Sequence, residues 1–181
     1  IFDYPAYESG MSRPVYSIDF SPDGQRMVCV TTHGEAMLWD ATEWKLIATR
    51  RLQNANMVSV RFSPDGEWLV TGEDQGAVRL WETASLQVKS IIGRHAARVR
   101  SVAFSPDCSP GNCEVAAAGE DQIITLWDAN RPNTATRIGS HASPVYAIAF
   151  SPGGKQLVSG AHDRSVRVYT RRRTLWGWRL E

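Results

Sequence analysis

Three polar residues in the last quarter of the chain are of the types that form a nucleophilic triad: His141, Ser159 and Asp163. In a triad the histidine takes the serine proton and the carboxylate orients the histidine. The same positions recur earlier in the chain with unreactive replacements, so a structural role explains these residues better than catalysis. A triad also needs an oxyanion hole and a substrate pocket, and nothing in the sequence indicates either. We therefore predict no catalytic residues.

Two cysteines of one loop, Cys108 and Cys113, admit three interpretations: a small disulfide, half of a metal site, or two unpartnered thiols. No second cysteine pair and no close histidine completes a tetrahedral metal site, so we predict no metal and no cofactor. Cys29 lies in an apolar segment and is expected to pack in the core. Three irregularly spaced cysteines do not make a disulfide scaffold, which favours a reducing, cytoplasmic setting.

Basic residues gather in the second half of the chain. Residues 1–90 hold 8 basic and 12 acidic side chains, and residues 91–181 hold 12 and 7. The run Arg171-Arg172-Arg173, followed by Trp176 and Trp178, fits an outer strand after a hairpin, a protein contact built on arginine and aromatic residues, or phosphate binding with base stacking. Because the formal net charge is only +1, we do not expect nucleic acid to be a partner.

The overall composition is that of a folded domain without a membrane span. The chain has 181 residues, of which 43% are hydrophobic and 22% charged. This balance provides enough apolar side chains for a core and argues against disorder. No apolar run approaches the roughly 20 residues that a membrane helix needs.

A repeat organises the sequence. The tripeptide Phe-Ser-Pro begins at Phe20, Phe62, Phe104 and Phe150, in steps of 42, 42 and 46 residues. A second landmark follows each copy in phase: Trp39-Asp40, Trp81-Glu82, Trp127-Asp128 and Tyr169-Thr170. The third copy is four residues longer because the stretch 107–113 enlarges one loop. Repeats of this length are typical of stacked structural units.

Each unit has the pattern of four short antiparallel strands. Residues 145–150 alternate large and small side chains, as a strand with two dissimilar faces does. The Ser-Pro-Asp-Gly segments 21–24 and 63–66 fit a type I turn. In the second unit further strands are expected at 68–71, 77–81 and 86–92. Four such strands in about 42 residues predict an all-β fold made of propeller blades.

The period, the Trp-Asp endings and the pairs Gly93-Arg94-His95 and Gly139-Ser140-His141 make the chain resemble the WD-repeat β-propeller family, in its prokaryotic form, over nearly the whole length. The resemblance implies four blades of four strands each. The expected repeats are 11–52, 53–94, 95–140 and 141–181. Residues 1–10 are expected to be the outer strand of a preceding blade or an N-terminal extension.

The resemblance also implies a hydrogen-bonded network in each unit: a histidine before the first strand, a hydroxyl on the second, an aspartate in the next turn and a tryptophan on the third. No unit is complete. The matching residues are His141, Ser159 and Asp163 in unit four, where Tyr169 replaces the tryptophan; His95, Asp121 and Trp127 in unit three, where Ala117 or Ala118 replaces the hydroxyl; Thr71, Asp74 and Trp81 in unit two, where Gln53 replaces the histidine; and Trp39 alone in unit one, with Met11 at the histidine position and Thr32 in the turn.

The strand count favours an open arc or a part of a larger propeller. Residues 2–8 occupy the place of an outer strand from a preceding blade, and residues 174–180 supply the outer strand of the fourth. An open arc leaves apolar sheet faces exposed at both ends. We expect the missing blades, another subunit or a second copy of this chain to cover them.

The leading functional hypothesis is a non-enzymatic scaffold for protein–protein interaction, as the sensor or docking part of a larger polypeptide or complex. Loops on a rigid frame are where recognition resides. The alternatives are an enzyme with its site at the channel mouth, near the loop 107–113, and a nucleic-acid binder that uses the arginine-rich half. The candidate partner contacts, taken from the repeat phase, are Arg13, Asn56, Arg98, Arg100, Ser143, Tyr146, Trp176 and Trp178.

Overall fold

The computed structural model of this chain consists of short β-strands joined by tight turns. It describes residues 14–108, 113–171 and 178–180, the last for their backbone only. Within these residues every regular element is a strand, and the strands form four antiparallel sheets in which consecutive strands are neighbours. We call the sheets blades one to four.

The strands are grouped in fours along the chain. Blade one contains β1 (Val15–Phe20), β2 (Arg26–Thr31), β3 (Glu35–Asp40) and β4 (Lys45–Arg51). Blade two contains β5 (Met57–Phe62), β6 (Trp68–Glu73), β7 (Ala77–Glu82) and β8 (Gln87–Arg94). Blade three contains β9 (Val99–Phe104), β10 (Glu114–Gly119), β11 (Ile123–Asp128) and β12 (Ala135–Ser140). Blade four contains β13 (Val145–Phe150), β14 (Gln156–Ala161), β15 (Val166–Arg171) and β16 (Trp178–Leu180).

The Ser-Pro-Asp-Gly segments form the turns between the first two strands of a blade. In blade one the Gly24 N–H donates to the Ser21 carbonyl at 2.8 Å, and Gly24 adopts a φ of 71° that suits glycine. The Ser21 hydroxyl donates to Asp23 at 2.6 Å, which holds the turn closed. Ser63 and Gly66 repeat the backbone bond in blade two at 2.9 Å.

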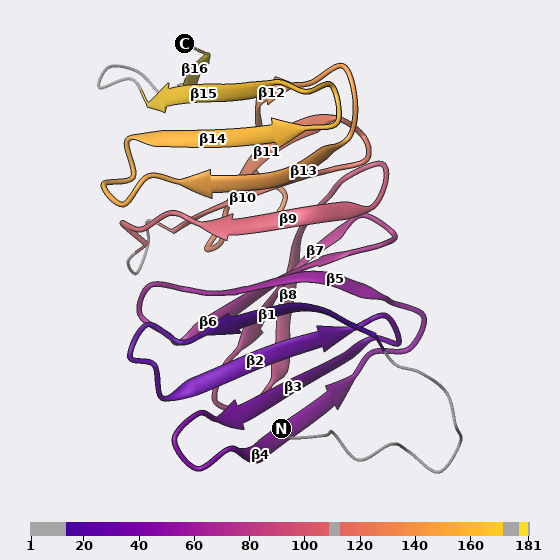
Figure 1. The fold of residues 1–181 in the computed structure, drawn as a ribbon, viewed down its shortest axis with the longest axis vertical. Helices are drawn as coiled ribbons and strands as arrows, with labels where there is room; N and C mark the ends of the chain where they lie inside the picture. The colour runs from indigo at the N-terminus through magenta and orange to yellow at the C-terminus, as the bar shows by residue number, and fades with distance from the viewer. Residues whose placement is uncertain (1–13, 109–112, 172–177, 181) are drawn as a thin grey trace.

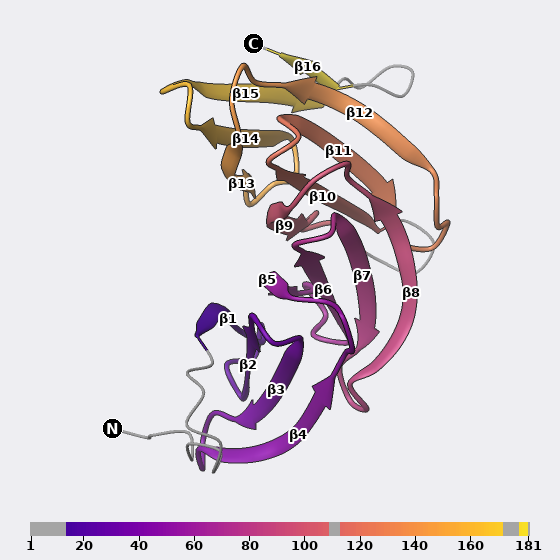
Figure 2. The ribbon, with the colours of Figure 1, turned by 90° about the vertical axis from the view of Figure 1, so that its right-hand side faces the viewer.

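The four blades stand side by side along an arc (Figure 1). The first strands of the blades (β1, β5, β9 and β13) lie along its concave edge, and β4, β8 and β12 lie along its convex edge (Figure 2). β1 packs against β5, β5 against β9 and β9 against β13. β1 and β13 lie at opposite ends of the arc, so the described chain does not close into a ring, as predicted.

The hydrophobic core is divided into three layers, each between two neighbouring blades. The first layer joins Leu38 of blade one to Phe62 and Trp81 of blade two. The second joins blade two to Phe104 and Trp127 of blade three, and the third joins blade three to blade four. Each blade is therefore held mainly by its neighbours in sequence, as in other repeat proteins.

At the two ends of the chain the structure covers only part of what the sequence predicts. β16 is the described part of the expected outer strand 174–180, and it pairs antiparallel with β15. Residues 2–8, the expected strand of a preceding blade, lie outside the described residues. None of the described segments is a helix long and apolar enough to cross a membrane.

Candidate functional site

His141 and Ser159 meet in the interior of blade four. The His141 Nε2 lies 2.7 Å from the Ser159 hydroxyl oxygen, and its Nδ1 lies 3.2 Å from Asp163 Oδ2 and 2.9 Å from Ser165 Oγ. Ser159 is completely buried and His141 nearly so. A nucleophile must reach its substrate, so this burial supports a structural role for the three residues of triad type.

Asp163 organises the turn between β14 and β15. Its carboxylate accepts hydrogen bonds from the Ser165 hydroxyl at 2.6 Å and from the Ala142 N–H at 3.0 Å. The Ser165 hydrogen bond, together with the Ala142 and Ser165 amides, holds the pKa of Asp163 well below its usual range. The ionised carboxylate thus fixes the segment that enters β13. Ser165 was missed by the sequence reasoning, although its place two residues after Asp163 is a common Asx-turn position.

Blade three brings His95 and Asp121 together in the same way. The His95 Nδ1 lies 2.7 Å from Asp121 Oδ2, and the Ala96 N–H donates to that oxygen at 3.2 Å. Ala117 pairs with Val102 and Thr125 as Ser159 pairs with Ile148 and Arg167, so Ala117 stands at the hydroxyl position. Among the residues described, the buried His95 Nε2 accordingly has no hydrogen-bond partner.

Blade two keeps the tryptophan bond but not the histidine. The Trp81 Nε1–H donates to the Thr71 hydroxyl at 2.9 Å, and Asp74 accepts from Asn56 Nδ2 at 2.7 Å. The Leu52 N–H donates to the Gly34 carbonyl as the His95 N–H donates to Gly76, so Leu52 stands at the histidine position. The assignment of Gln53 to that position was wrong, because the loop entering β5 carries its extra residue after Leu52.

Blade one has a cysteine where blades two and four have a hydroxyl. Cys29 pairs with Met37 as Thr71 pairs with Arg79, which places the Cys29 thiol at the hydroxyl position beside Trp39. Burial raises the pKa of the Cys29 thiol, and a hydrogen bond from Trp39 partly offsets the rise. Cys29 is buried, as expected, but the sequence reasoning did not connect it with Trp39. Thr32 lies in the next turn, with its hydroxyl 3.2 Å from His33 Nδ1, and Met11 lies outside the described residues.

Three of the candidate partner contacts come together on one rim. The Arg100 guanidinium lies 4.8 Å from the centroid of the Tyr146 ring and donates to Glu120 at 2.7 Å. Arg98 lies 3.8 Å from the same carboxylate. The Tyr146 ring in turn packs edge-on against His162, with centroids 5.9 Å apart. We call Arg98, Arg100, Glu120, Tyr146 and His162 the rim cluster.

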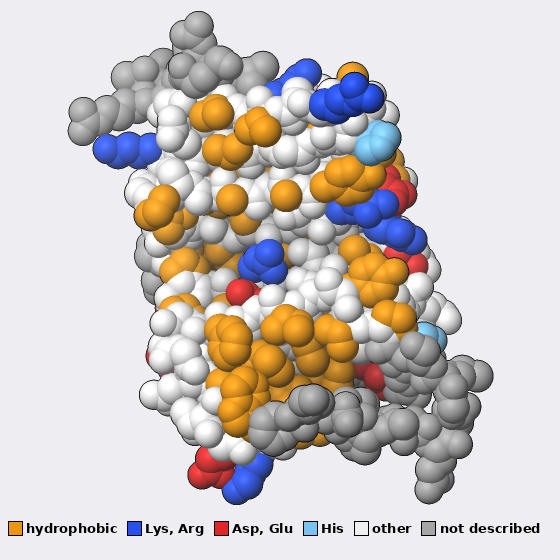
Figure 3. Space-filling view, viewed as in Figure 1, with side chains coloured by type: hydrophobic (Ala, Val, Ile, Leu, Met, Phe, Trp, Pro, Cys, Tyr) orange, Lys and Arg blue, Asp and Glu red, His pale blue; other side chains and the backbone are white. Residues whose placement is uncertain are grey.

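The rim cluster lies where β9 and β13 begin and where the turns after β10 and β14 reverse the chain. Tyr146 is 47% exposed, and the side chain of Arg98 is 41% exposed. Figure 3 shows basic, acidic, apolar and histidine side chains adjoining one another at this edge, on its right-hand side. Glu120 and His162 were not predicted as contact residues, although each directly precedes the aspartate of its turn and the repeat phase places both on this rim.

The other candidate contacts lie elsewhere. Asn56 is on the same rim in blade two, bound to Asp74. Ser143 lies two residues before β13 and is partly buried. Arg13 and Trp176 lie outside the described residues, and Trp178 begins β16 opposite Arg171.

The first arginine of the basic run binds within the chain. Arg171 donates to Asp107 at 2.9 Å and to Glu114 at 2.5 Å, and so joins blade four to blade three. Burial raises the pKa of the Glu114 carboxyl, and the Arg171 charge partly offsets this. Arg171 is therefore engaged with carboxylates, whereas phosphate binding needs basic side chains that face solvent.

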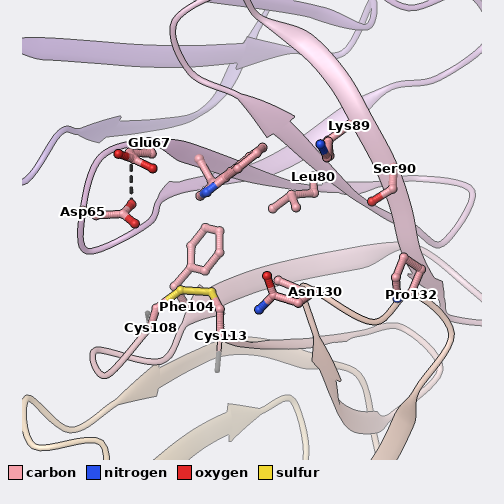
Figure 4. Close-up of a pocket in the computed structure, with 12 residues that line it drawn as sticks. Asp65, Glu67, Leu80, Lys89, Ser90, Phe104, Cys108, Cys113, Asn130 and Pro132 are labelled. Atoms are coloured by element: carbon pink, nitrogen blue, oxygen red, sulfur yellow. Dashed lines mark hydrogen bonds between the residues drawn. A yellow bond between two sulfur atoms is a disulfide. The ribbon is translucent and has the colours of Figure 1, made fainter. Parts of the chain in front are cut away.

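A pocket of about 390 Å³ lies between blades two and three. Its walls include Trp68, Phe104 and a disulfide between Cys108 and Cys113, and its titratable residues are Asp65, Glu67 and Lys89. Figure 4 shows the disulfide beside Phe104, with Lys89 across the pocket. Of the three interpretations of this cysteine pair, the structure therefore supports the small disulfide. With a disulfide present, cysteine usage no longer favours a reducing compartment. Across the described residues, no three His, Cys, Asp or Glu side chains are grouped to hold a metal ion.

Comparison with known proteins agrees with the architecture. The family model for the WD domain, G-beta repeat (WD40), matches residues 6–40, 44–82, 86–128 and 133–170. No curated protein matches the chain. The four matched segments end on or next to the Trp-Asp landmarks or their replacements, and together they cover most of the sequence. The chain therefore belongs to the WD40 repeat family.

Proposed function

We propose that this chain is a non-enzymatic scaffold for protein–protein interaction and that it works as the propeller part of a larger polypeptide or complex. WD40 repeats generally mediate protein–protein interaction, and this chain adds a particular surface for it. Its role in the assembly is docking: the blades form a rigid frame, and one rim carries the contact residues.

The observation that carries the proposal is the rim cluster. Arginine and tyrosine are enriched among the residues that dominate binding energy at protein interfaces. Here Arg100 is held against Tyr146 at 4.8 Å, so both side chains are ordered before a partner arrives. Such pre-organisation lowers the entropic cost of binding.

The experiment compares three forms of the chain as bait in a native extract. These are the wild type, a Tyr146→Ala variant and a Lys155→Ala control, whose altered residue lies in the turn after β13 on the opposite rim. A partner of the rim cluster is retained by the wild type and by Lys155→Ala and is lost from Tyr146→Ala. With that partner purified, Tyr146→Ala should weaken binding about 10-fold or more.

Partners retained equally by all three forms would place the binding surface elsewhere and would overturn the role of the rim cluster. Arg100→Ala provides a second check, because it removes the cation above the Tyr146 ring and leaves the ring in place. It should weaken binding to the same partner. Circular dichroism of each variant confirms that the fold is intact.

A further inference from the structure

Every inner boundary of the arc joins two complementary faces. We call the face that a blade turns toward the preceding blade its N-side face, and the opposite one its C-side face. At the boundary of blades one and two, Met57, Val60 and Phe62 on the N-side face of blade two are buried at 0%, 0% and 7% exposure against the C-side face of blade one. Val99, Val102 and Phe104 hold the same register positions in blade three and are buried in the same way.

The N-side face of blade one carries the same pattern without a neighbour among the described residues. Val15, Ile18 and Phe20 occupy the register positions of Met57, Val60 and Phe62. They are 49%, 53% and 50% exposed. Figure 3 shows the apolar side chains of this end gathered into a broad patch in the lower half of the view. Large exposed apolar patches mark interaction sites.

The C-side face of blade four is the matching surface at the other end. Val166 corresponds in register to Val78 and Ile124, which are fully buried, yet Val166 is 71% exposed. Gly160 corresponds to Gly72. A side chain at Gly72 would collide with Val99 of the next blade, whereas a side chain at Gly160 would meet nothing. Gly160 therefore lies where a further blade would pack the first residue of its first strand. Val15 is that residue in blade one.

From this correspondence we infer that two copies of the chain associate head to tail. The C-side face of blade four of each copy packs on the N-side face of blade one of the other, closing a ring of eight blades. Each chain thus supplies both faces of the contact, the N-side face of blade one and the C-side face of blade four. A C-side face packs on an N-side face there, as at the inner boundaries. Propellers of up to eight blades are known, and a contact between two different patches can close into a ring. The inference is independent of the rim cluster.

The inner boundaries share a hydrogen bond that blade four cannot make, and this difference provides a second test. At each inner boundary a serine hydroxyl of one blade accepts from a backbone N–H of the next: Ser17 from Val60, Ser59 from Val102 and Ser101 from Ile148, at 3.2–3.3 Å. Blade four has Ala147 at this register position. The Ala147→Ser variant would supply the acceptor for the Ile18 N–H of the second copy.

The test is the mass of the 181-residue chain in solution, measured by native mass spectrometry over a range of concentrations. The wild type should form a species of twice 20.1 kDa. Ile18→Asp and Val166→Asp each place a charge on one of the two faces and should each be monomeric. Mixed together they should form a heterodimer, because each retains the face that the other has lost. Ala147→Ser adds one hydrogen bond at each of the two boundaries, each worth about 2- to 10-fold, so it should tighten the dimer about 4- to 100-fold.

Matched controls make each outcome decisive. Ile47→Asp, at an equally exposed isoleucine on β4, should leave the dimer intact. A dimer that survives Val166→Asp would mean that blade one packs on blade one, and it would overturn the inference. A wild-type monomer at all concentrations, species larger than two copies, or no effect of Ala147→Ser would equally contradict it. A failure here leaves the partner test of the rim cluster unaffected.

Discussion

In every blade the ring N–H or hydroxyl of the aromatic landmark residue is buried. The hydrogen-bond partner of this polar group differs from one blade to the next. Trp81 donates to Thr71, and Trp39 interacts with the Cys29 thiol. The Tyr169 hydroxyl is buried and has no hydrogen-bond partner within the described part of the chain. Because an unmatched buried polar group costs free energy, the four blades should respond differently to substitutions of the same kind.

Thr71→Val should destabilise the chain. Valine has nearly the shape of threonine but removes the acceptor of the buried Trp81 N–H, so the free energy of unfolding should fall by about 1–3 kcal/mol. Urea denaturation followed by tryptophan fluorescence measures the change. The matched control is Tyr169→Phe, which removes a hydroxyl without a described partner and should leave stability unchanged or raise it by about 1 kcal/mol. If both variants lowered the free energy of unfolding equally, the hydrogen bond between Trp81 and Thr71 would not explain the effect of Thr71→Val.

Asp163 should make the chain less stable in acid. The Ser165 hydrogen bond and the neighbouring amides lower the pKa of Asp163 in the folded chain, so the unfolded chain binds the proton more readily. The stabilisation by this carboxylate is complete above the unfolded pKa of about 3.9 and is lost as the pH falls toward the folded pKa. Asp163→Asn should therefore be less stable than the wild type at neutral pH, and the difference should shrink below about pH 4. A difference that stays constant across urea titrations from neutral to acidic pH would contradict this role.

At the scale of elements, the outer strands of blades two and three each approach the aromatic ring of the next blade through a glycine. A side chain at Gly93 of β8 would collide with the Trp127 ring of β11. In blade three Gly139 of β12 meets Tyr169 of β15 in the same way. These glycines let the convex edges of neighbouring blades close over the buried aromatic rings.

Gly93→Ala should therefore loosen the boundary between blades two and three. Relief of the collision requires a shift of β8 or of the Trp127 ring, at a cost of about 1–3 kcal/mol in the free energy of unfolding. Gly153→Ala is the control, since its added methyl group meets nothing. It should be neutral or stabilising by up to about 1 kcal/mol. Thermal unfolding of the two variants provides the comparison, and an unchanged Gly93→Ala midpoint would disprove the close packing.

The sequence predicts the elements well and the contacts between blades less well. The Phe-Ser-Pro turns and the Trp-Asp landmarks place β6 to β8 within a few residues of their observed bounds, because turn chemistry and strand alternation are local. The histidine position of blade two was misassigned because one extra residue in a loop shifts a count made along the chain. The pair of Arg100 and Tyr146 joins two blades, so its geometry depends on the curvature of the arc, which no local pattern reports.

At the scale of the whole molecule, the blades form an arc with two unlike ends, and one rim carries the rim cluster. Neighbouring blades share their core layers, whereas blade one and blade four each keep a sheet face uncovered within the described residues. The rim cluster lies on blades three and four, apart from the exposed face of blade one (Figure 3).

The openness of the arc is tested most directly by the distance between β1 and β13 within one chain. Spin labels at Tyr16→Cys and Ala147→Cys, both exposed positions, report that distance in a Cys29→Ser background. An excess of unlabelled chain ensures that only pairs within one molecule are measured. The open arc predicts a separation far larger than the roughly 10 Å between packed sheets. A separation close to that spacing would mean that blade one packs against blade four in the same chain, and it would contradict the arc.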